Sequence, residues 1–226
     1  MGVREKRRKA RGLFITLEGV EGSGKSTQLR YLAQALRRSG YPVVQTREPG
    51  GTGVAEAIRQ TLLLSSSREP ITPEAESLLI LAARSQHATH LIAPSVRRGA
   101  IVLCDRFSDS TFAYQGFARG LDLTWLQTAN AVATKGHNPD LTLLFDVPVK
   151  VGLTRRRNDS GKQNRLDRES EGFHRSVRRG FLALAAQAPR RIKVFNANKP
   201  VQELRAEVTA FVLGWVAKRQ QKPGKR

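Results

Sequence analysis

The residues with the clearest chemical meaning form a glycine-rich stretch near the start of the chain. It reads Gly19-Val20-Glu21-Gly22-Ser23-Gly24-Lys25-Ser26 and matches the pattern G-x-x-x-x-G-K-[S/T] in full. Glycine accepts the left-handed backbone angles that turn successive N–H groups onto a polyphosphate, and a helix N-terminus adds partial positive charge. Lys25 can then reach the terminal phosphates, and the Ser26 hydroxyl is an oxygen ligand for Mg²⁺. The stretch therefore predicts a nucleotide-binding loop.

The elements around this loop have the order that such a loop requires. Residues 13–17 are apolar and partly β-branched, which is typical of a buried strand, and residues 28–38 repeat apolar residues at helical spacing. A glycine-rich turn that matched the pattern by chance would rarely lie between such a strand and such a helix.

The rest of the chain alternates short apolar runs with helical patterns. We expect further strands at 43–46, 101–104, 141–147 and 192–195, and helices at 53–64, 72 to about 96, 126–134, from about 149, up to about 188, and 201–218. Such alternation favours an α/β fold of P-loop type, a three-layer α/β/α arrangement with a five-stranded parallel sheet. We predict one domain over residues 12–217, a disordered basic tail over 1–11 and a basic C-terminal tail over 218–226.

An acidic residue follows the third of these strands. Asp105 lies at the carboxyl end of a buried-type run, where open α/β sheets bind their ligands. Beside a phosphate-binding loop its carboxylate can order the water shell of Mg²⁺, so Ser26 and Asp105 form the predicted metal site. His87 and His90 lie three residues apart without a third ligand nearby, so we expect them on the polar face of their helix.

Arginines recur in the segments that should face the loop. They are Arg47, Arg106, Arg155, Arg156, Arg157, Arg165 and Arg168. Phosphoryl transfer between two phosphates brings two polyanions together, so it needs cationic clamping and exclusion of water. We therefore predict a short basic lid over about residues 155–170, although charge pattern alone leaves a solvated loop as an alternative.

Several other P-loop classes fit the sequence less well. A GTPase should carry a guanine-reading N-K-x-D, which Thr134-Lys135-Gly136-His137 does not match. A motor or helicase would spend more chain on a nucleic-acid track. A small-molecule kinase remains the expected class, since the P-loop alone does not specify the reaction.

The composition is strongly basic and poor in cysteine. The formal charge is +20, and about half of this excess lies in the two tails, which are solvated or make nonspecific polyanion contacts. Cys104 is the single cysteine, so no intramolecular disulfide forms, and we expect it buried in a reducing cytosol. Glu18 stops the first apolar run too early for a signal peptide or a membrane span, so we expect a cytoplasmic protein without a membrane anchor.

Four segments together resemble bacterial thymidylate kinases, and the resemblance covers nearly the whole predicted domain. The most specific of them is Thr46-Arg47-Glu48-Pro49-Gly50-Gly51-Thr52. The others are residues 18–27 around the glycine-rich loop, Ala82-Ala83-Arg84-Ser85-Gln86-His87, and the stretch from Asp105-Arg106-Phe107-Ser108-Asp109-Ser110-Thr111 to Ala113-Tyr114-Gln115-Gly116.

The resemblance implies phosphoryl transfer from ATP to dTMP with Mg²⁺, giving dTDP and ADP in dTTP biosynthesis. Gly19, Val20, Glu21, Gly22, Ser23, Gly24, Lys25, Ser26 and Thr27 would bind ATP. Glu21, Arg47, Arg84, Arg106, Ser110, Thr111 and Gln115 would bind dTMP, and Lys25, Asp105, Arg106 and Arg168 would be catalytic. Arg168 would be the lid arginine, because this P-loop carries no arginine of its own. Members of the family commonly form homodimers, and the helix near 73–96 is the candidate contact.

Two alternatives to this interpretation stay open. The first is another small-molecule P-loop kinase, acting on a deoxynucleoside or on a different nucleoside monophosphate. The second, motivated by the charge, is a basic ATPase stimulated by nucleic acid. The kinase interpretation requires no nucleic acid and leaves both tails dispensable.

Two positions depart from the family pattern. Ile80 stands four residues before Arg84, where an aromatic ring often stacks on thymine, so Phe107 or Phe112 would have to supply any stacking. The last strand ends in Asn196-Ala197 where an Asp-Ala pair is common near the adenine site. Neither change removes a phosphate or magnesium contact.

The first prediction concerns Ile80. Ile80→Phe should tighten dTMP binding several-fold, because a stacked ring contributes about 1 kcal/mol beyond its buried area. Isothermal titration of dTMP into both proteins measures the effect. An unchanged dissociation constant would rule out a missing ring as a limit on affinity.

Overall fold

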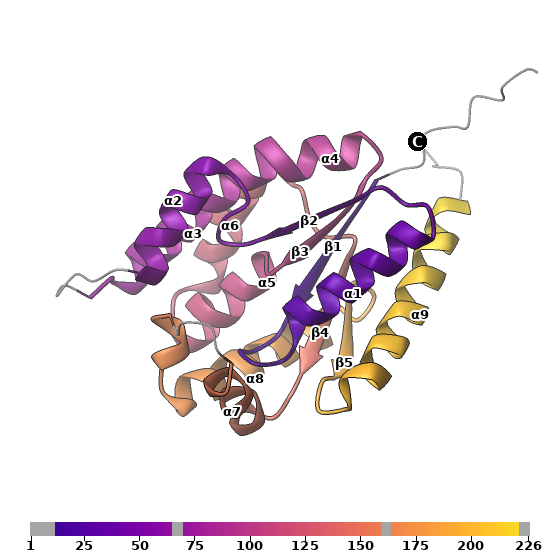
Figure 1. Ribbon diagram of the computed structural model, residues 1–226. Helices are drawn as coiled ribbons and strands as arrows, with labels where there is room; N and C mark the ends of the chain where they lie inside the picture. Colours follow the sequence, from indigo (N-terminus) through magenta and orange to yellow (C-terminus); the bar gives the residue numbers. More distant parts are fainter. Residues whose placement is uncertain (1–11, 65–69, 160–163, 222–226) are drawn as a thin grey trace, which may run out of the picture.

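The computed structural model describes residues 12–64, 70–159 and 164–221 (Figure 1). The expected basic tail over 1–11 and the end of the C-terminal tail lie outside these ranges. The elements, in chain order, are β1 (Leu13–Glu18), α1 (Lys25–Arg38), β2 (Val43–Arg47), α2 (Gly53–Leu64), α3 (Pro73–His87), the π-helical η1 (Ala88–Ile92), α4 (Ala93–Arg97), β3 (Ile101–Asp105), α5 (Ser108–Thr111), the π-helical η2 (Phe112–Ala118), α6 (Leu123–Thr134), β4 (Leu141–Asp146), α7 (Val149–Arg157), the 3₁₀ turn η3 (Leu166–Arg168), α8 (Glu171–Gln187), β5 (Ile192–Asn196) and α9 (Val201–Gln221).

The strands form one parallel five-stranded sheet in the order β2-β3-β1-β4-β5. β1 lies at the centre, and all its residues are buried, as expected of a strand covered on both faces. The register pairs Leu17 with Asp105 and Glu18 with Leu144, which brings the carboxyl ends of three strands together. The α/β fold with a five-stranded parallel sheet, predicted from the sequence, is confirmed.

Helices cover both faces of the sheet (Figure 1). α1 and α9 pack against each other and against the strands on one face, and α4 and α8 contact strands on the other. Successive residues of β1 serve the two faces: Leu13 and Ile15 join the larger core cluster, whereas Phe14 joins a smaller one with Phe107. Cys104 is fully buried, as predicted, and its Sγ donates to the Arg106 carbonyl at 3.0 Å.

The structure differs from the sequence prediction at three places along the chain. The single helix expected from 72 to about 96 changes to π-helical geometry at η1, just before Pro94, whose ring removes one backbone donor from the helix. α9 continues to Gln221, so residues 218–221, assigned to the C-terminal tail, are helical. The helical segments α5 and η2 follow β3 where no helix was predicted. The division into a kinase domain between two tails stays a prediction.

None of the helices in the described parts of the chain combines the length and the apolar character that crossing a bilayer requires.

A glycine controls how closely α8 packs on η2. A Cβ added to Gly180 would lie 2.8 Å from Cγ of Phe117, closer than packed atoms tolerate. Gly180→Ala should therefore lower the free energy of unfolding by about 1–3 kcal/mol through overpacking. Gly214 of α9 is the matched control, because its Cβ would meet no atom within 4 Å. Gly214→Ala should raise stability by up to about 1 kcal/mol through helix propensity, and urea denaturation measures both. Equal effects would contradict the packing argument.

Candidate functional site

The phosphate-binding loop connects β1 to α1 at the carboxyl edge of the sheet. Gly24 has φ 85° and is the N-cap of α1, a left-handed conformation that favours glycine. Gly22 also has positive φ, and a Cβ there would overlap the carbonyl group of Gly152 in α7. Gly152 in turn leaves no room for a side chain, because its Cβ would lie 2.5 Å from the Glu21 carbonyl oxygen. The loop and the base of α7 therefore touch backbone to backbone.

Lys25 lies folded back onto this loop. Its Nζ donates to the carbonyl oxygens of Gly19 at 2.9 Å and Val20 at 2.8 Å, and to Oγ of Ser23 at 3.2 Å. Burial and the neighbouring Arg106 lower the pKa of Lys25 to about 8, against the opposing effect of Asp105 and Glu21. The loop thus holds a buried cation at the place where phosphates would bind.

A cavity of about 550 Å³ lies beside the loop. Of the residues predicted to bind ATP or phosphate, those on its wall are Glu21, Gly22, Gly24, Lys25, Ser26, Thr27, Arg47, Asp105 and Arg106. Gly19, Val20 and Ser23 are not on this wall; they accept hydrogen bonds from Lys25 behind it. Arg47 remains half-exposed and pairs with Glu56 at 3.0 Å.

The predicted metal ligands lie together. Oγ of Ser26 donates to Oδ2 of Asp105 at 2.6 Å, and both side chains face the cavity. The described residues contain no group of three or more His, Cys, Asp or Glu side chains suited to a metal. A pair of oxygen donors fits Mg²⁺, which usually takes one or two protein ligands and completes its shell with phosphate oxygens and water.

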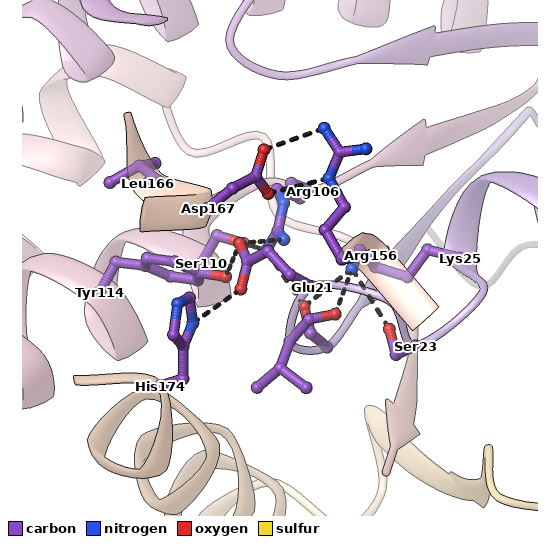
Figure 2. A network of polar contacts seen from close by, with 12 residues as sticks. Glu21, Ser23, Lys25, Arg106, Ser110, Tyr114, Arg156, Leu166, Asp167 and His174 are labelled. Atoms are coloured by element: carbon purple, nitrogen blue, oxygen red, sulfur yellow. Dashed lines mark hydrogen bonds and ion pairs between the residues drawn. The ribbon is translucent and has the colours of Figure 1, made fainter. Parts of the chain in front are cut away.

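Glu21 is held on three sides (Figure 2). Its Oε1 accepts from the Tyr114 hydroxyl at 2.5 Å and from Nη2 of Arg106 at 3.0 Å, while Nδ1 of the fully buried His174 lies 3.1 Å from Oε2. Burial acts to raise the pKa of Glu21, but Arg106, His174 and Lys25 outweigh it and hold the pKa at about 2. The carboxylate is therefore ionised at neutral pH and already oriented.

Glu18, at the end of β1, has the opposite tendency. Burial, together with the nearby Asp109, raises the pKa of Glu18 to about 7, despite Arg106 and the donors Ser110 and Phe107 N–H. Ser110 Oγ donates to Glu18 at 2.6 Å and accepts from Nη1 of Arg106 at 3.1 Å. Glu18 thus fixes Ser110, one of the predicted dTMP-binding residues.

A second, smaller cavity of about 60 Å³ opens beside the first. Its wall contains Arg84, Arg106, Ser110, Thr111 and Gln115, all predicted from the resemblance, together with Ile80, Phe107, Tyr114 and the shared residues Glu48, Pro49 and Leu166. Phe107 is on this wall, whereas Phe112 lines a different cavity beside α6. Of the two rings considered as substitutes for the missing aromatic, only Phe107 lies near Ile80.

Arg84 is a fully buried guanidinium at the end of this cavity. Nε donates to Oε2 of Glu48 at 2.7 Å, and Nη1 donates to Thr111 and Asn130, both at 2.9 Å. Nη2 donates no hydrogen bond to another described residue. The guanidinium also lies 5.0 Å from the centre of the Phe107 ring.

Glu48 in turn is anchored by His87. Oε1 of Glu48 lies 2.9 Å from Nδ1 of His87, and Nε2 of His87 lies 2.7 Å from Oγ1 of Thr46. The expectation that His87 occupies the polar face of its helix is wrong: the side chain is fully buried, because Glu48 and Thr46 satisfy both ring nitrogens. His90 is exposed, as predicted.

The predicted basic lid places only some of its arginines at the cavity. Arg155 and Arg156 line it, and Arg156 makes a bidentate ion pair with Asp167 at 3.0 and 2.9 Å (Figure 2). Arg165 instead pairs with the buried Glu76. Arg168 is exposed and is not on the cavity wall, so its catalytic role stays a prediction. Residues 160–163 of the lid lie outside the described ranges.

Several residues at the site were not singled out from the sequence. Arg59, Glu48, Tyr114 and His174 lie at or behind the cavity walls. Glu48 and Tyr114 stand inside the segments that carried the resemblance, so their position in the motifs was a usable signal. Arg59 and His174 lie on α2 and α8, and only the fold brings them here.

Comparison with known proteins agrees with this geometry. The thymidylate kinase family model matches residues 17–208. The chain belongs to the thymidylate kinase family. It is 47% identical over 201 residues to a thymidylate kinase from Ectopseudomonas mendocina, covering 89% of this chain and 95% of that protein. It is 49% identical over 199 residues to one from Thermomicrobium roseum (88% and 93%) and 45% identical over 213 residues to one from Geobacter sulfurreducens (92% and 100%).

The thymidylate kinase match begins inside β1 and ends inside α9. It therefore includes the phosphate-binding loop, both cavities and the pair of Glu48 and Arg84, and it leaves the basic tails outside.

The buried pair of Glu48 and Arg84 generates a stability prediction for this member of the thymidylate kinase family. Glu48→Gln keeps the side-chain shape but leaves the charge of Arg84 uncompensated in the interior, so the free energy of unfolding should fall by about 3 kcal/mol or more. The matched control is Glu203→Gln, which breaks an exposed, solvent-screened contact with Lys199 and should leave stability nearly unchanged. Urea denaturation at neutral pH measures both. Equal, small losses would show that Arg84 does not depend on Glu48.

Proposed function

We propose that this protein transfers the terminal phosphoryl group of ATP to dTMP, giving dTDP and ADP, with Mg²⁺ and in the cytoplasm. The observation that carries the proposal is the junction of the two cavities. They share Glu48, Pro49, Arg106 and Leu166, so a ligand in the smaller cavity would present its end to a ligand in the phosphate-binding loop. Membership of the thymidylate kinase family and the names of the relatives support dTMP as the acceptor.

The smaller cavity suits the base of the acceptor. Ile80 and Phe107 offer apolar contact, and Nη2 of Arg84 is the donor available for a carbonyl at the base edge. Because Glu48, Thr111 and Asn130 hold the other donors of Arg84, binding would require little reorganisation of this side chain. Ser110, Thr111 and Gln115 would complete the base pocket, and Gln115 is oriented by its hydrogen bond to Glu76 at 2.7 Å.

The phosphate of the acceptor would lie where the cavities join. Arg106 is present on both walls, and Arg47 faces the larger one, so the two guanidinium groups can clamp the phosphate. Glu21 would accept a hydrogen bond from the 3′-hydroxyl of the deoxyribose. Its low pKa supports this role, because an ionised carboxylate acts only as an acceptor.

The donor nucleotide would occupy the loop over residues 19–27. Backbone N–H groups would hold its phosphates, and Lys25 would exchange its contacts with the loop carbonyls for the terminal phosphates. Ser26 and Asp105 would hold Mg²⁺, which supplies charge neutralisation between the donor phosphates when bound.

Transfer of the phosphoryl group would then depend on the alignment of donor and acceptor and on the cations around the transferred group. Arg106 from the acceptor side and Lys25 from the donor side approach the same space, and Arg155 or Arg156 would add charge from the lid. Because the phosphoryl oxygens carry the developing charge, fixed guanidinium groups stabilise the transition state more than mobile water does. Arg168 would need a movement of the lid to reach the same place.

A homodimer is part of the proposal. Leu78 of α3 and Val54 of α2 are apolar side chains that are each 56% exposed, and the two helices pack side by side. Such side chains support an intersubunit contact at α3.

The test is ADP formation from ATP and Mg²⁺ with each deoxy- and ribonucleoside monophosphate in turn. We expect transfer to dTMP, weaker transfer to dUMP and little to AMP, GMP or CMP. Arg47→Ala should raise KM for dTMP and lower kcat/KM by about 10-fold or more, because a charge-assisted contact contributes about 1.5–3 kcal/mol. Arg175→Ala, an exposed arginine paired with Glu171, is the matched control and should retain activity. Equal use of all monophosphates would refute the assignment.

A further inference from the structure

The edge of the sheet opposite the candidate active site is basic in all its described connections. Because all strands are parallel, their amino ends meet at this edge, together with the C-terminal ends of the helices that lead into them. The ends of α1, α4 and α6, the turn before β5 and the end of α9 carry Arg37, Arg38, Arg97, Arg98, Lys135, Arg190, Arg191, Lys218 and Arg219. Asp140 is the one acidic residue in these described connections, and Arg219 lies 3.9 Å from it.

These cations divide into two sets. Some stabilise the fold: Arg191 pairs with Asp109 at 2.6 Å, Arg37 donates to the Val43 carbonyl and Arg98 donates to Ser95. Arg219 belongs with them, through Asp140 and the Trp215 ring. The remaining five make no side-chain hydrogen bond or ion pair within residues 12–64, 70–159 and 164–221, and all are exposed. We call this second set the amino-edge cations: Arg38, Arg97, Lys135, Arg190 and Lys218.

The two basic tails of the sequence join the fold at the same edge. Leu13 N–H donates to the Ala100 carbonyl at the start of β3, so the chain enters β1 here. α9 ends beside Asp140 at the start of β4, so residue 221 also lies here. Figure 1 shows both ends of the described chain on this side of the molecule.

Helix dipoles explain part of this distribution. Cations are favourable in the last turn of a helix, where they contribute about 0.3–1 kcal/mol. Arg190 follows the end of α8 and precedes β5, and neither it nor Arg38 is hydrogen-bonded to a helix carbonyl. Dipole stabilisation also does not account for the scarcity of acidic residues across connections from both helical layers.

We propose that the amino edge binds single-stranded nucleic acid through its phosphodiester backbone. The amino-edge cations come from helices on both faces of the sheet, so they surround one end of the molecule rather than forming a flat patch. A flexible polyphosphate can follow such a surface, whereas a planar bilayer would contact only part of it. Arginine predominates, and its planar fork matches phosphate oxygens. The opposite edge, with the nucleotide cavities, remains open in this arrangement.

The test is the affinity of the full chain for a mixed-sequence single-stranded RNA, followed by fluorescence anisotropy over a range of salt concentrations. The edge variant replaces all the amino-edge cations by glutamine: R38Q, R97Q, K135Q, R190Q and K218Q. The control variant removes the same number of charges elsewhere: R30Q, K150Q, R175Q, R179Q and R205Q. Both variants keep the tails and the same net charge. Kinase assays with dTMP and circular dichroism confirm that both are folded.

We expect micromolar to sub-millimolar binding by the unmodified chain at physiological salt. The edge variant should bind at least about 10-fold more weakly, and its log–log salt slope should fall by about 0.7 for each phosphate that it no longer neutralises, while the control variant changes little. Single-stranded DNA should behave as RNA does, since the shared backbone is the ligand. Equal weakening of both variants would show that net charge alone acts. Binding to anionic phosphatidylglycerol vesicles with no binding to RNA would assign the edge to a membrane surface. Either result would overturn the proposal.

Discussion

The candidate site depends on one partly buried guanidinium. Arg106 contacts the Gly19 carbonyl, Ser110 and Glu21, and it lies 5.0 Å from the centre of the Tyr114 ring, so it links the phosphate-binding loop to η2. It takes φ 70°, a conformation that costs a non-glycine residue about 1–3 kcal/mol. Its backbone N–H, donating to the Leu17 carbonyl at 3.0 Å, helps to hold that conformation. The cost is tolerable because so many partners satisfy a charge that must be present before any phosphate arrives.

Around Arg106 the charges are balanced rather than uniformly positive. Lys25 has a lowered pKa, Glu21 a lowered one and Glu18 a raised one, each set by burial and by the same few neighbours. A purely cationic pocket would repel itself before binding its ligand. The acidic residues therefore allow the pocket to form before the ligand binds. In the same way, the carboxylate of Glu48 balances the charge of the buried Arg84.

Most of the fold could be predicted from the sequence, because local sequence patterns specify its strands, helices and turns. The loop glycines, the alternation of apolar runs and the cap residue Thr72 of α3 specify short-range structure. Contacts formed across the fold were harder to foresee. His87 shows helical polar spacing yet is buried, since its partners Glu48 and Thr46 come from another element. His174 reaches Glu21 only because α8 packs on η2. Arg168, predicted as the lid arginine, is not on the cavity wall, whereas Arg155 and Arg156 are, because charge pattern does not specify the geometry of a loop.

The backbone contact between Gly22 and Gly152 has a mechanical consequence. Neither residue has a side chain that could be shortened to relieve pressure, so a displacement of the loop toward α7 must move α7 as well. A nucleotide that shifts the loop toward α7 would therefore shift α7 as well. The same contact constrains both positions: a substitution at either one has no partner change available to rescue it, so both should remain glycine.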